Sequence, residues 1–239
     1  MKLGGLQKLT LLDFPEHVAC TVFTWGCNFR CPWCHNSSLV LSDRIHEEGL
    51  ITEEEFFGFL NKRKGLLEGV AITGGEPLLQ PDIREFIMKI RDMGFLVKLD
   101  TNGSFPDKLK ELLDEHLVDY VAMDIKNPLG SYGKVCGLTN PPVEKLSESI
   151  ALLKGSGIPY EFRTTVIDEF HDEESMAGIA DLIEGAERYF LQRFEDSGEL
   201  IEEGIYHAPS EEKLMKLLKT VRQKAPNAQI RGGEILKES

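Results

Sequence analysis

The sequence predicts an α/β fold built on a parallel β-sheet with crossover helices. Three observations predict it: strand-like and helix-like segments alternate about six times, the helical segments carry their own start and stop signals, and polar side chains follow successive strands directly. Alternation of this kind favours parallel strands joined by helices. Six β–α units could close incompletely as a partial (β/α)6 barrel or lie open as a doubly wound sheet, and periodicity alone leaves both open.

Short runs rich in apolar and β-branched residues predict the strands. These runs lie at residues 17–24, 69–72, 95–99, 118–125, 160–167 and 189–194, with a last short strand at 228–231. Helices are expected at residues 52–64, 81–93, 106–115, 143–154, 173–184 and 210–224. Each helix is therefore expected to be a crossover between two parallel strands.

Residues at the ends of these helices support the assignments. Thr52 followed by Glu55 has the spacing of a capping box. Pro81 lies near the first turn of its helix and Gly94 lies past the end. Ser210 is a suitable N-cap for the last helix. We therefore expect these three segments to be helical.

Length and composition fit one domain of ordinary globular composition. The chain has 239 residues, of which 41% are hydrophobic, and a formal net charge of −13. We expect a single domain over residues 1–239, with its core at about 8–194 and a C-terminal helix and short strand at 210–231. The acidic charge disfavours binding to nucleic acid. No apolar run reaches the ~18 residues of a membrane span, and residues 1–10 lack a secretory signal, so we expect a cytoplasmic protein without membrane partners.

Three of the five cysteines lie in one short segment that follows the first predicted strand. Cys27, Cys31 and Cys34 are separated by four and three positions. Three thiolates can hold three irons of a [4Fe–4S] cluster and leave the fourth iron open to a small chelating ligand. An odd number of cysteines in a chain without a secretory signal disfavours disulfide pairing. We therefore predict one cluster at this segment.

A zinc site is the alternative for the same segment. It would use the three cysteines together with His35, but His35 is adjacent to Cys34, whereas structural zinc sites usually bring two ligand pairs from separated segments. Of the other two cysteines, Cys20 alternates with apolar residues on the predicted strand and is expected in the core. Cys136 lies in a predicted loop and receives no role.

Polar groups follow further strands as well. They are Thr-Gly-Gly-Glu-Pro at 73–77, Asp-Thr-Asn-Gly at 100–103 and Asp-Ile-Lys at 124–126, together with Arg163 inside a later strand. Taken alone, each segment can be explained without a ligand. The first two segments could be tight turns. For Lys126 and Arg163 the explanation is an internal salt bridge to Asp100 or Asp124. Because the carboxyl ends of parallel strands share the face where ligands bind, the segments together predict one ligand site.

The cysteine segment, the Thr-Gly-Gly-Glu-Pro segment and the order of the later features resemble the radical S-adenosylmethionine superfamily. The cysteines followed by His35 and Asn36, with Asp-Thr-Asn-Gly at 100–103, are most similar to the activating enzymes of glycyl radical proteins. The opening Leu-Thr-Leu-Leu-Asp-Phe-Pro at 9–15 resembles one branch, the activating proteins of anaerobic ribonucleoside-triphosphate reductase. The resemblance covers roughly residues 8–194 and implies a partial (β/α)6 barrel.

The resemblance also implies roles for single residues. Cys27, Cys31 and Cys34 would hold the cluster, whose open iron would take the amino and carboxylate groups of the methionine moiety. Trp33 and His35 would help to fix the adenine, Gly74, Gly75 and Glu76 would hold the ammonium group, and Lys126 and Arg163 would approach the carboxylate or ribose. Asn36, Asp100 and Asn102 are also expected to bind the cofactor. Related pyruvate formate-lyase activators bind a monovalent cation where this chain has Asp100 and Asp124.

The same resemblance implies a reaction and partners. With an electron from a flavodoxin- or ferredoxin-type donor, the cluster would cleave S-adenosylmethionine to methionine and a 5′-deoxyadenosyl radical. That radical would generate a glycyl radical on a partner protein, expected to be anaerobic ribonucleoside-triphosphate reductase. The lyase activators have a cofactor-contacting histidine near the sixth strand, where this chain has Gln192 and Phe194. Two alternatives stay open: a small-molecule enzyme similar to 7-carboxy-7-deazaguanine synthases, and a non-enzymatic zinc or interaction module.

Overall fold

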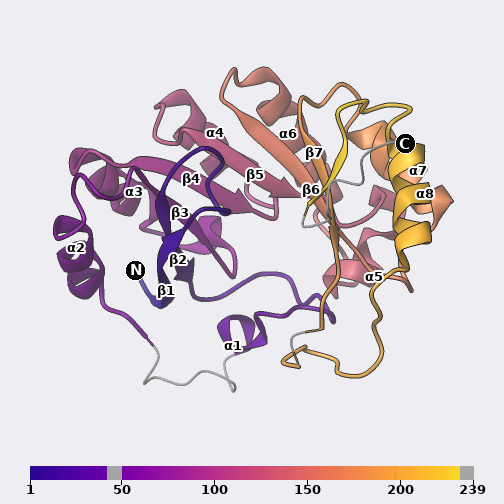
Figure 1. Cartoon of the computed structure of the whole chain (residues 1–239), viewed down its shortest axis with the longest axis horizontal. Coiled ribbons are helices and arrows are strands. Elements are labelled where there is room, and N and C mark those ends of the chain that lie inside the picture. Colours follow the sequence, from indigo (N-terminus) through magenta and orange to yellow (C-terminus); the bar gives the residue numbers. More distant parts are fainter. Residues whose placement is uncertain (42–49, 197, 232–239) are drawn as a thin grey trace.

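The computed structural model describes residues 1–41, 50–196 and 198–231, and one curved sheet of eight strands forms its centre (Figure 1). The strands are β1 Leu3–Thr10, β2 Ala19–Thr24, β3 Gly69–Gly74, β4 Leu96–Thr101, β5 Tyr120–Asp124, β6 Tyr160–Val166, β7 Tyr189–Arg193 and β8 Gln229–Arg231. β1 pairs with β2 in the antiparallel sense, and every later pair of neighbours is parallel. The predicted parallel sheet is confirmed, with one antiparallel strand added.

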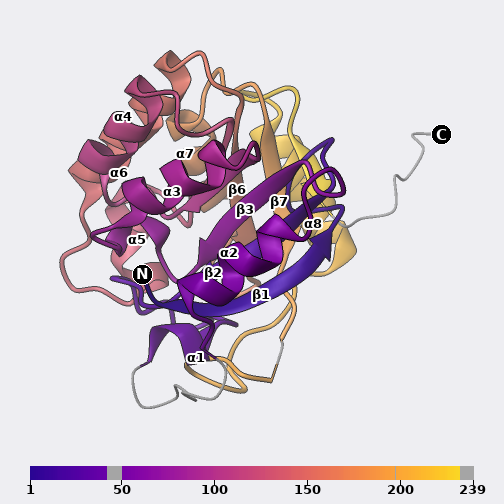
Figure 2. The ribbon, with the colours of Figure 1, turned by 90° about the vertical axis from the view of Figure 1, so that its left-hand side faces the viewer.

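The helices lie around the outside of this curved sheet (Figures 1 and 2). They are α1 Ser37–Val40, α2 Glu53–Asn61, α3 Ile83–Asp92, α4 Pro106–Asp114, α5 Tyr132–Cys136, α6 Val143–Gly155, α7 Glu173–Leu182 and α8 Glu211–Val221, with short 3₁₀ turns η3 Pro77–Leu79 and η4 Leu129–Ser131. None of the helices in the described ranges combines the length and the apolarity that crossing a membrane requires.

The order of the strands decides between the two architectures that periodicity left open. A doubly wound sheet reverses its strand order at one point, whereas here the strands lie side by side in chain order from β1 to β8. The helices cover the convex side of the sheet (Figure 1). Among the described residues, β1 and β8 are the two edge strands and do not pair with each other, so the barrel is partial. The fold is therefore the expected partial (β/α)6 barrel.

The capping signals read from the sequence are present in the structure. The Glu55 N–H donates to Thr52 Oγ1 at 3.1 Å, and the Thr52 N–H donates to Glu55 Oε2 at 2.9 Å. The Lys213 N–H donates to Ser210 Oγ at 3.1 Å and so caps α8. Gly94 follows α3 with a φ of +90°, a conformation that glycine adopts without strain. The three helices begin one or two residues after the predicted starts, and α2 and α8 end three residues before the predicted ends.

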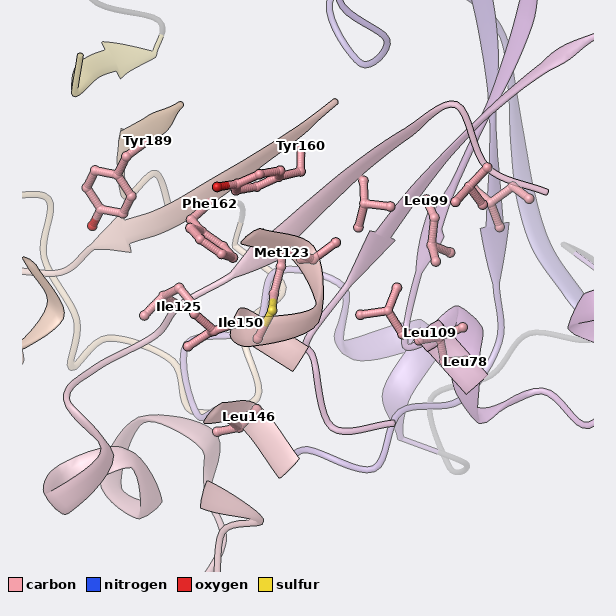
Figure 3. Packing of buried hydrophobic residues seen from close by; sticks show 14 of the residues in the cluster. Leu78, Leu99, Leu109, Met123, Ile125, Leu146, Ile150, Tyr160, Phe162 and Tyr189 are labelled. Atoms are coloured by element: carbon pink, nitrogen blue, oxygen red, sulfur yellow. The ribbon is translucent and has the colours of Figure 1, made fainter. Parts of the chain in front are cut away.

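The main apolar core fills the space between the sheet and the helices (Figure 3). Leu99 of β4, Met123 of β5 and Phe162 of β6 point from the sheet toward α4 and α6, which supply Leu109 and Ile150. All five side chains are buried. Full burial of such a side chain contributes roughly 1.5–3 kcal/mol. The core therefore gives the loops at the strand ends a rigid base.

Two elements differ from the sequence prediction. β1 was not predicted, and only Leu3 and Thr10 at its ends are buried, so its sequence carries no strand-like alternation. The predicted loop around Cys136 contains the helix α5, so the loop assignment of this cysteine was wrong. The cysteine segment contacts this short helix, as the Arg30 N–H donates to the Cys136 carbonyl at 2.9 Å. Cys20 is fully buried on β2, as expected for a core residue.

Candidate active site

A pocket of about 240 Å³ lies at the carboxyl ends of β3 to β7, beside the cysteine segment that follows β2. Most residues proposed from the sequence line it: Cys27, Cys31, Trp33, Cys34, His35, Asn36, Gly74, Gly75, Glu76, Asp100, Asn102, Lys126 and Arg163. The remaining lining residues are Phe29, Val40, Thr73, Thr101, Asp124, Thr165 and Gln192. The fold thus brings the predicted residues together at one cavity, while the role of each stays a prediction.

The cysteine segment is hydrogen-bonded to α5. The Arg30 N–H donates to the Cys136 carbonyl, and the Trp33 Nε1–H donates to the Val135 carbonyl at 3.1 Å. Gly137, directly after α5, lies so close that a Cβ on it would stand 2.0 Å from the Arg30 carbonyl oxygen. The conformation of the cysteine segment is therefore fixed by the protein itself.

Burial controls the charge state of the three thiols. It raises the pKa of Cys27 to about 11 and that of Cys31 to about 12, and it raises the pKa of Cys34 as well. Backbone N–H groups oppose this effect at two sulfurs, with the Phe29 N–H 3.3 Å from Cys27 Sγ and the Asn36 N–H at Cys34. The thiols are protonated in the protein alone, so loading a metal centre must release protons.

The donor set fits an iron–sulfur cluster. Thiolates are soft ligands that suit iron–sulfur clusters, and the cysteines in the described chain are free rather than paired in disulfides. The N–H groups directed at Cys27 and Cys34 would stabilise the negative charge that these sulfurs carry as ligands. Cys27, Cys31 and Cys34 come from one rigid segment and line the same pocket. They are therefore the residues that would hold three irons of a cluster.

The two glycines after β3 allow two backbone segments to approach closely. Gly74 has a φ of +115°, and a Cβ there would stand 2.4 Å from the Thr24 nitrogen. A Cβ on Gly75 would stand 2.0 Å from the Gly26 carbonyl oxygen. The Gly75 N–H donates to the Thr24 carbonyl at 2.9 Å, and the Glu76 N–H donates to the Gly26 carbonyl at 2.8 Å. These two hydrogen bonds therefore join the turn after β3 to residues 24–26, which lead into the cysteine segment.

Glu76 is fully buried and directs its carboxylate at the turn after β4. The carboxylate accepts hydrogen bonds from the Asn102 N–H at 2.6 Å, the Thr101 hydroxyl at 2.8 Å and the Leu78 N–H at 3.1 Å. Burial raises the pKa of Glu76 to about 7 although these bonds lower it. A carboxylate offers about four acceptor sites. Glu76 therefore positions Thr101 and Asn102 and retains one site for a further donor.

Arg163 on β6 joins the acidic residues at the ends of β4 and β5. Its Nη1 lies 3.1 Å from Asp100 Oδ2, and its Nε lies 3.0 Å from Asp124 Oδ1. Lys98 pairs with Asp100, and Lys126 Nζ lies 3.3 Å from Asp124 Oδ2. Burial would raise the pKa of both aspartates, but Arg163 and the lysines lower it overall, that of Asp124 to about 2. The internal salt bridge considered from the sequence is present.

The guanidinium of Arg163 balances the charge of Asp100 and Asp124 in this structure. The same two carboxylates were considered as ligands of a monovalent cation. Within the described ranges, no group of three or more His, Cys, Asp or Glu side chains is arranged so that it could surround one metal ion. The three cysteines are no exception, because each would bind a different iron of a cluster. The cation site stays a prediction, and a cation there would compete with the guanidinium for the two carboxylates.

Lys126 is positioned by a histidine that the sequence analysis missed. Its Nζ lies 5.0 Å from the centre of the Trp33 ring, a favourable cation–π distance. His171 Nε2 donates to the Lys126 carbonyl at 3.0 Å, and His171 Nδ1 accepts from the Ile167 N–H at 3.0 Å. Burial lowers the pKa of His171, which keeps the ring neutral. No motif marks residue 171, since its role depends on how the end of β6 meets the end of β5.

Some of the other lining residues could have been predicted from the sequence, and others could not. Thr165 follows Arg163 with the two-residue period of a strand, so alternation along β6 could have found it. Val40 lies on the unpredicted helix α1, and no sequence signal marks it. Of the two residues named in place of the missing histidine, Gln192 lines the pocket, whereas Phe194 is buried in the apolar core.

The fold and the site together define a class of protein: a partial barrel with three cysteines and a charged ligand pocket at the strand ends. A model of the Radical SAM superfamily matches residues 21–183. The match covers more than half of the chain, so the protein belongs to the radical SAM superfamily. It is an enzyme that uses a [4Fe–4S] cluster and S-adenosylmethionine.

Proteins of similar sequence support this membership. A protein of Methanocaldococcus jannaschii, named provisionally as a glycyl-radical enzyme activating enzyme, is 33% identical over 236 residues, which are 96% of this chain and 95% of the relative. The pyruvate formate-lyase-activating enzyme of Clostridium pasteurianum is 26% identical over 188 residues, 76% of each chain. The 7-carboxy-7-deazaguanine synthase of Methanopyrus kandleri is 34% identical over 120 residues, 43% of this chain and 47% of the relative.

Solved structures share the fold. SuiB of Streptococcus suis, bound to S-adenosylmethionine, matches with a TM-score of 0.66 at 15% sequence identity. The match covers 87% of this chain and 49% of SuiB, so the chain spans about half the length of that structure. At this identity the likeness concerns the fold alone.

Proposed function

We propose that this enzyme activates a glycyl radical protein, and that its partner is anaerobic ribonucleoside-triphosphate reductase. One observation carries the proposal: the thiols of Cys27, Cys31 and Cys34 line the same pocket as the cationic side chains of Lys126 and Arg163. The near full-length similarity to the M. jannaschii protein supports the activating role. The resemblance of residues 9–15 to the reductase activators supports the choice of partner.

The residues of the pocket have distinct tasks in this proposal. When bound, the cluster supplies the electron that cleaves S-adenosylmethionine into methionine and a 5′-deoxyadenosyl radical. Lys126 and Arg163 are cationic and are proposed to face the carboxylate or ribose side of the cofactor. The free acceptor site of Glu76 suits the ammonium group of the methionine moiety. These residues bind and orient S-adenosylmethionine, and they perform no proton transfer in the cleavage.

The open side of the barrel suits a protein substrate. In the part of the chain that the structure describes, β1 and β8 are edge strands, and no strand pairing joins them. A loop that carries the target glycine could enter there and reach the strand ends where the pocket lies. A flavodoxin- or ferredoxin-type protein is the proposed electron donor.

Electron paramagnetic resonance tests the proposal directly. The reconstituted and reduced protein is mixed with S-adenosylmethionine and anaerobic ribonucleoside-triphosphate reductase under anaerobic conditions. We expect a glycyl radical signal that is absent without S-adenosylmethionine and absent with the Cys34→Ala variant. A silent spectrum from protein that carries a complete, reducible cluster would rule out this partner.

The similarity to 7-carboxy-7-deazaguanine synthase supports a second candidate, a radical enzyme acting on a small molecule. We propose a pterin as that substrate. That similarity covers less than half of either chain, and His35-Asn36 and Asp100 favour the activating enzymes. Turnover of S-adenosylmethionine coupled to a pterin substrate, without any protein partner, would favour the second candidate.

A further inference from the structure

We propose that Asn102 tunes the reduction potential of the cluster through an N–H···S hydrogen bond to Cys27, and that Asn28 aims its amide group. Both residues act as positioning residues for the cofactor chemistry. The inference rests on the assignment of Cys27 as a cluster ligand, so its test is separate from the test of that assignment.

Three side chains form a closed network next to Cys27. Asn102 Nδ2 lies 3.0 Å from Asn28 Oδ1 and 3.9 Å from Cys27 Sγ. Asn102 Oδ1 accepts from the Ser104 N–H at 2.9 Å and from the Ser104 hydroxyl at 2.5 Å. Asn28 Nδ2 donates to Ser104 Oγ at 2.9 Å. The donors on Ser104 fix the oxygen end of the Asn102 amide, so its NH₂ end must face Asn28 and the sulfur.

Two of the three side chains in the network are buried, and Asn28 is half-buried. Asn102 is 6% exposed and Ser104 is 2% exposed. The backbone N–H of Asn102 is held by Glu76 at 2.6 Å, which fixes the turn from the opposite side. Hydrogen bonds in such a low-dielectric environment are electrostatically stronger than in water. Asn28 is adjacent to Cys27 in the chain, so the two asparagines connect the cysteine segment to the turn after β4.

The Cys27 sulfur therefore has two N–H groups near it, the Asn102 amide and the Phe29 backbone N–H at 3.3 Å. Cys27 loses its proton when it becomes a ligand, and a thiolate is a stronger acceptor than a thiol. A reduced cluster carries one more negative charge than an oxidised one. Donors to the ligand sulfur stabilise the reduced form more, which raises the potential. Asn102 therefore makes the cluster easier to reduce.

A potentiometric titration of the reconstituted holoenzyme, followed by the electron paramagnetic resonance signal of the reduced cluster, tests this inference. We expect Asn102→Ala to shift the midpoint potential to a more negative value. Asn28→Ala should produce a smaller shift in the same direction, because the Asn102 amide is then released rather than removed. If Asn102→Ala fails to hold a cluster, the Asn28→Ala measurement decides alone.

Ser149→Ala is the matched control. Ser149 Oγ donates to the Gly103 carbonyl at 2.7 Å, so it holds the same turn without touching the asparagines or the sulfur. We expect this variant to lose stability and to keep the wild-type potential. An unchanged potential in the asparagine variants, or an equal shift in Ser149→Ala, would overturn the inference. Absence of any four-iron signal in the wild-type protein would instead refute the assignment of the cluster ligands.

Discussion

Arg163 Nε donates to Asp124 Oδ1 across 3.0 Å, and the two residues lie directly opposite each other on the paired strands β6 and β5. The same guanidinium also reaches Asp100 on β4. Removal of one partner from a buried charge network usually costs about 3–5 kcal/mol, because the remaining charges lose compensation. The ends of three neighbouring strands therefore depend on one side chain.

Replacement of this arginine should destabilise the fold strongly. We expect Arg163→Met to lower the free energy of unfolding by about 3–5 kcal/mol at neutral pH, measured by urea denaturation. The loss should shrink as pH falls from about 4 toward 2, since Asp124 keeps its charge in the folded protein until its pKa of about 2. Arg84→Met, which removes a partly exposed pair with Glu115, should cost only about 1 kcal/mol or less. Equal losses in the two variants would contradict this account.

The three pocket cysteines should be separable from the other two by metal content. Cys27→Ala, Cys31→Ala and Cys34→Ala should each lose iron and sulfide after anaerobic reconstitution, with the brown colour. Cys20→Ala and Cys136→Ala are the controls, because these thiols are buried and lie outside the pocket lining. They should retain wild-type iron. Full iron in any of the first three variants, or loss of iron in both controls, would contradict the ligand assignment.

Glu76 should make the stability fall as pH rises. The unfolded chain releases the Glu76 proton near 4.5, whereas burial raises the pKa in the folded protein to about 7. Between these values the folded state holds more protons, so the free energy of unfolding decreases with pH, by on the order of 1–3 kcal/mol. Glu76→Gln should flatten this dependence in denaturation curves collected across pH 4–8. Glu55→Gln is the control. Hydrogen bonds from Thr52 lower the pKa of Glu55, so this carboxylate changes the pH dependence of the free energy of unfolding in the opposite direction. Parallel curves for wild type and Glu76→Gln would contradict the prediction.

His171 should produce the opposite dependence at mildly acidic pH. Burial lowers its pKa below the ordinary 6.5, so below pH 6.5 the unfolded chain takes up a proton that the folded protein excludes. Stability is then lost as pH falls, and His171→Ala should lack that loss. At pH 8 the same variant should be less stable by about 1–3 kcal/mol, because the Lys126 carbonyl loses its donor. His207→Ala, which removes an exposed pair with Glu169, should change stability by less than about 1 kcal/mol.

Most of the parallel strands could be predicted because apolar and β-branched residues dominate them. In β3, for example, Gly69 to Ile72 are buried, since helices cover one side of the sheet and the barrel interior lies on the other. β1 could not be predicted, because its two glycines and polar residues give it no pattern of its own. Its position depends on antiparallel pairing with β2. α5 was missed because it has only five residues, too few to show a helical period.

The members of the site could be predicted, but many of their partners could not. Lining residues follow from the rule that parallel strands present their carboxyl ends on one face. The Arg163–Asp124 pair was one of several salt bridges considered from the sequence. The register between β5 and β6 places these two residues opposite each other. The link from Glu76 to Asn102 depends on the conformation of two turns that lie far apart in the chain. Sequence spacing carries no information about such contacts.

The central claim is that Cys27, Cys31 and Cys34 hold a cluster that cleaves S-adenosylmethionine. The most direct measurement is the amount of 5′-deoxyadenosine and methionine formed when the reconstituted protein is reduced with dithionite in the presence of S-adenosylmethionine. We predict that the two products appear in equal amounts and that the Cys31→Ala variant forms neither. Protein that carries a complete, reduced cluster and yet leaves S-adenosylmethionine intact would contradict the claim.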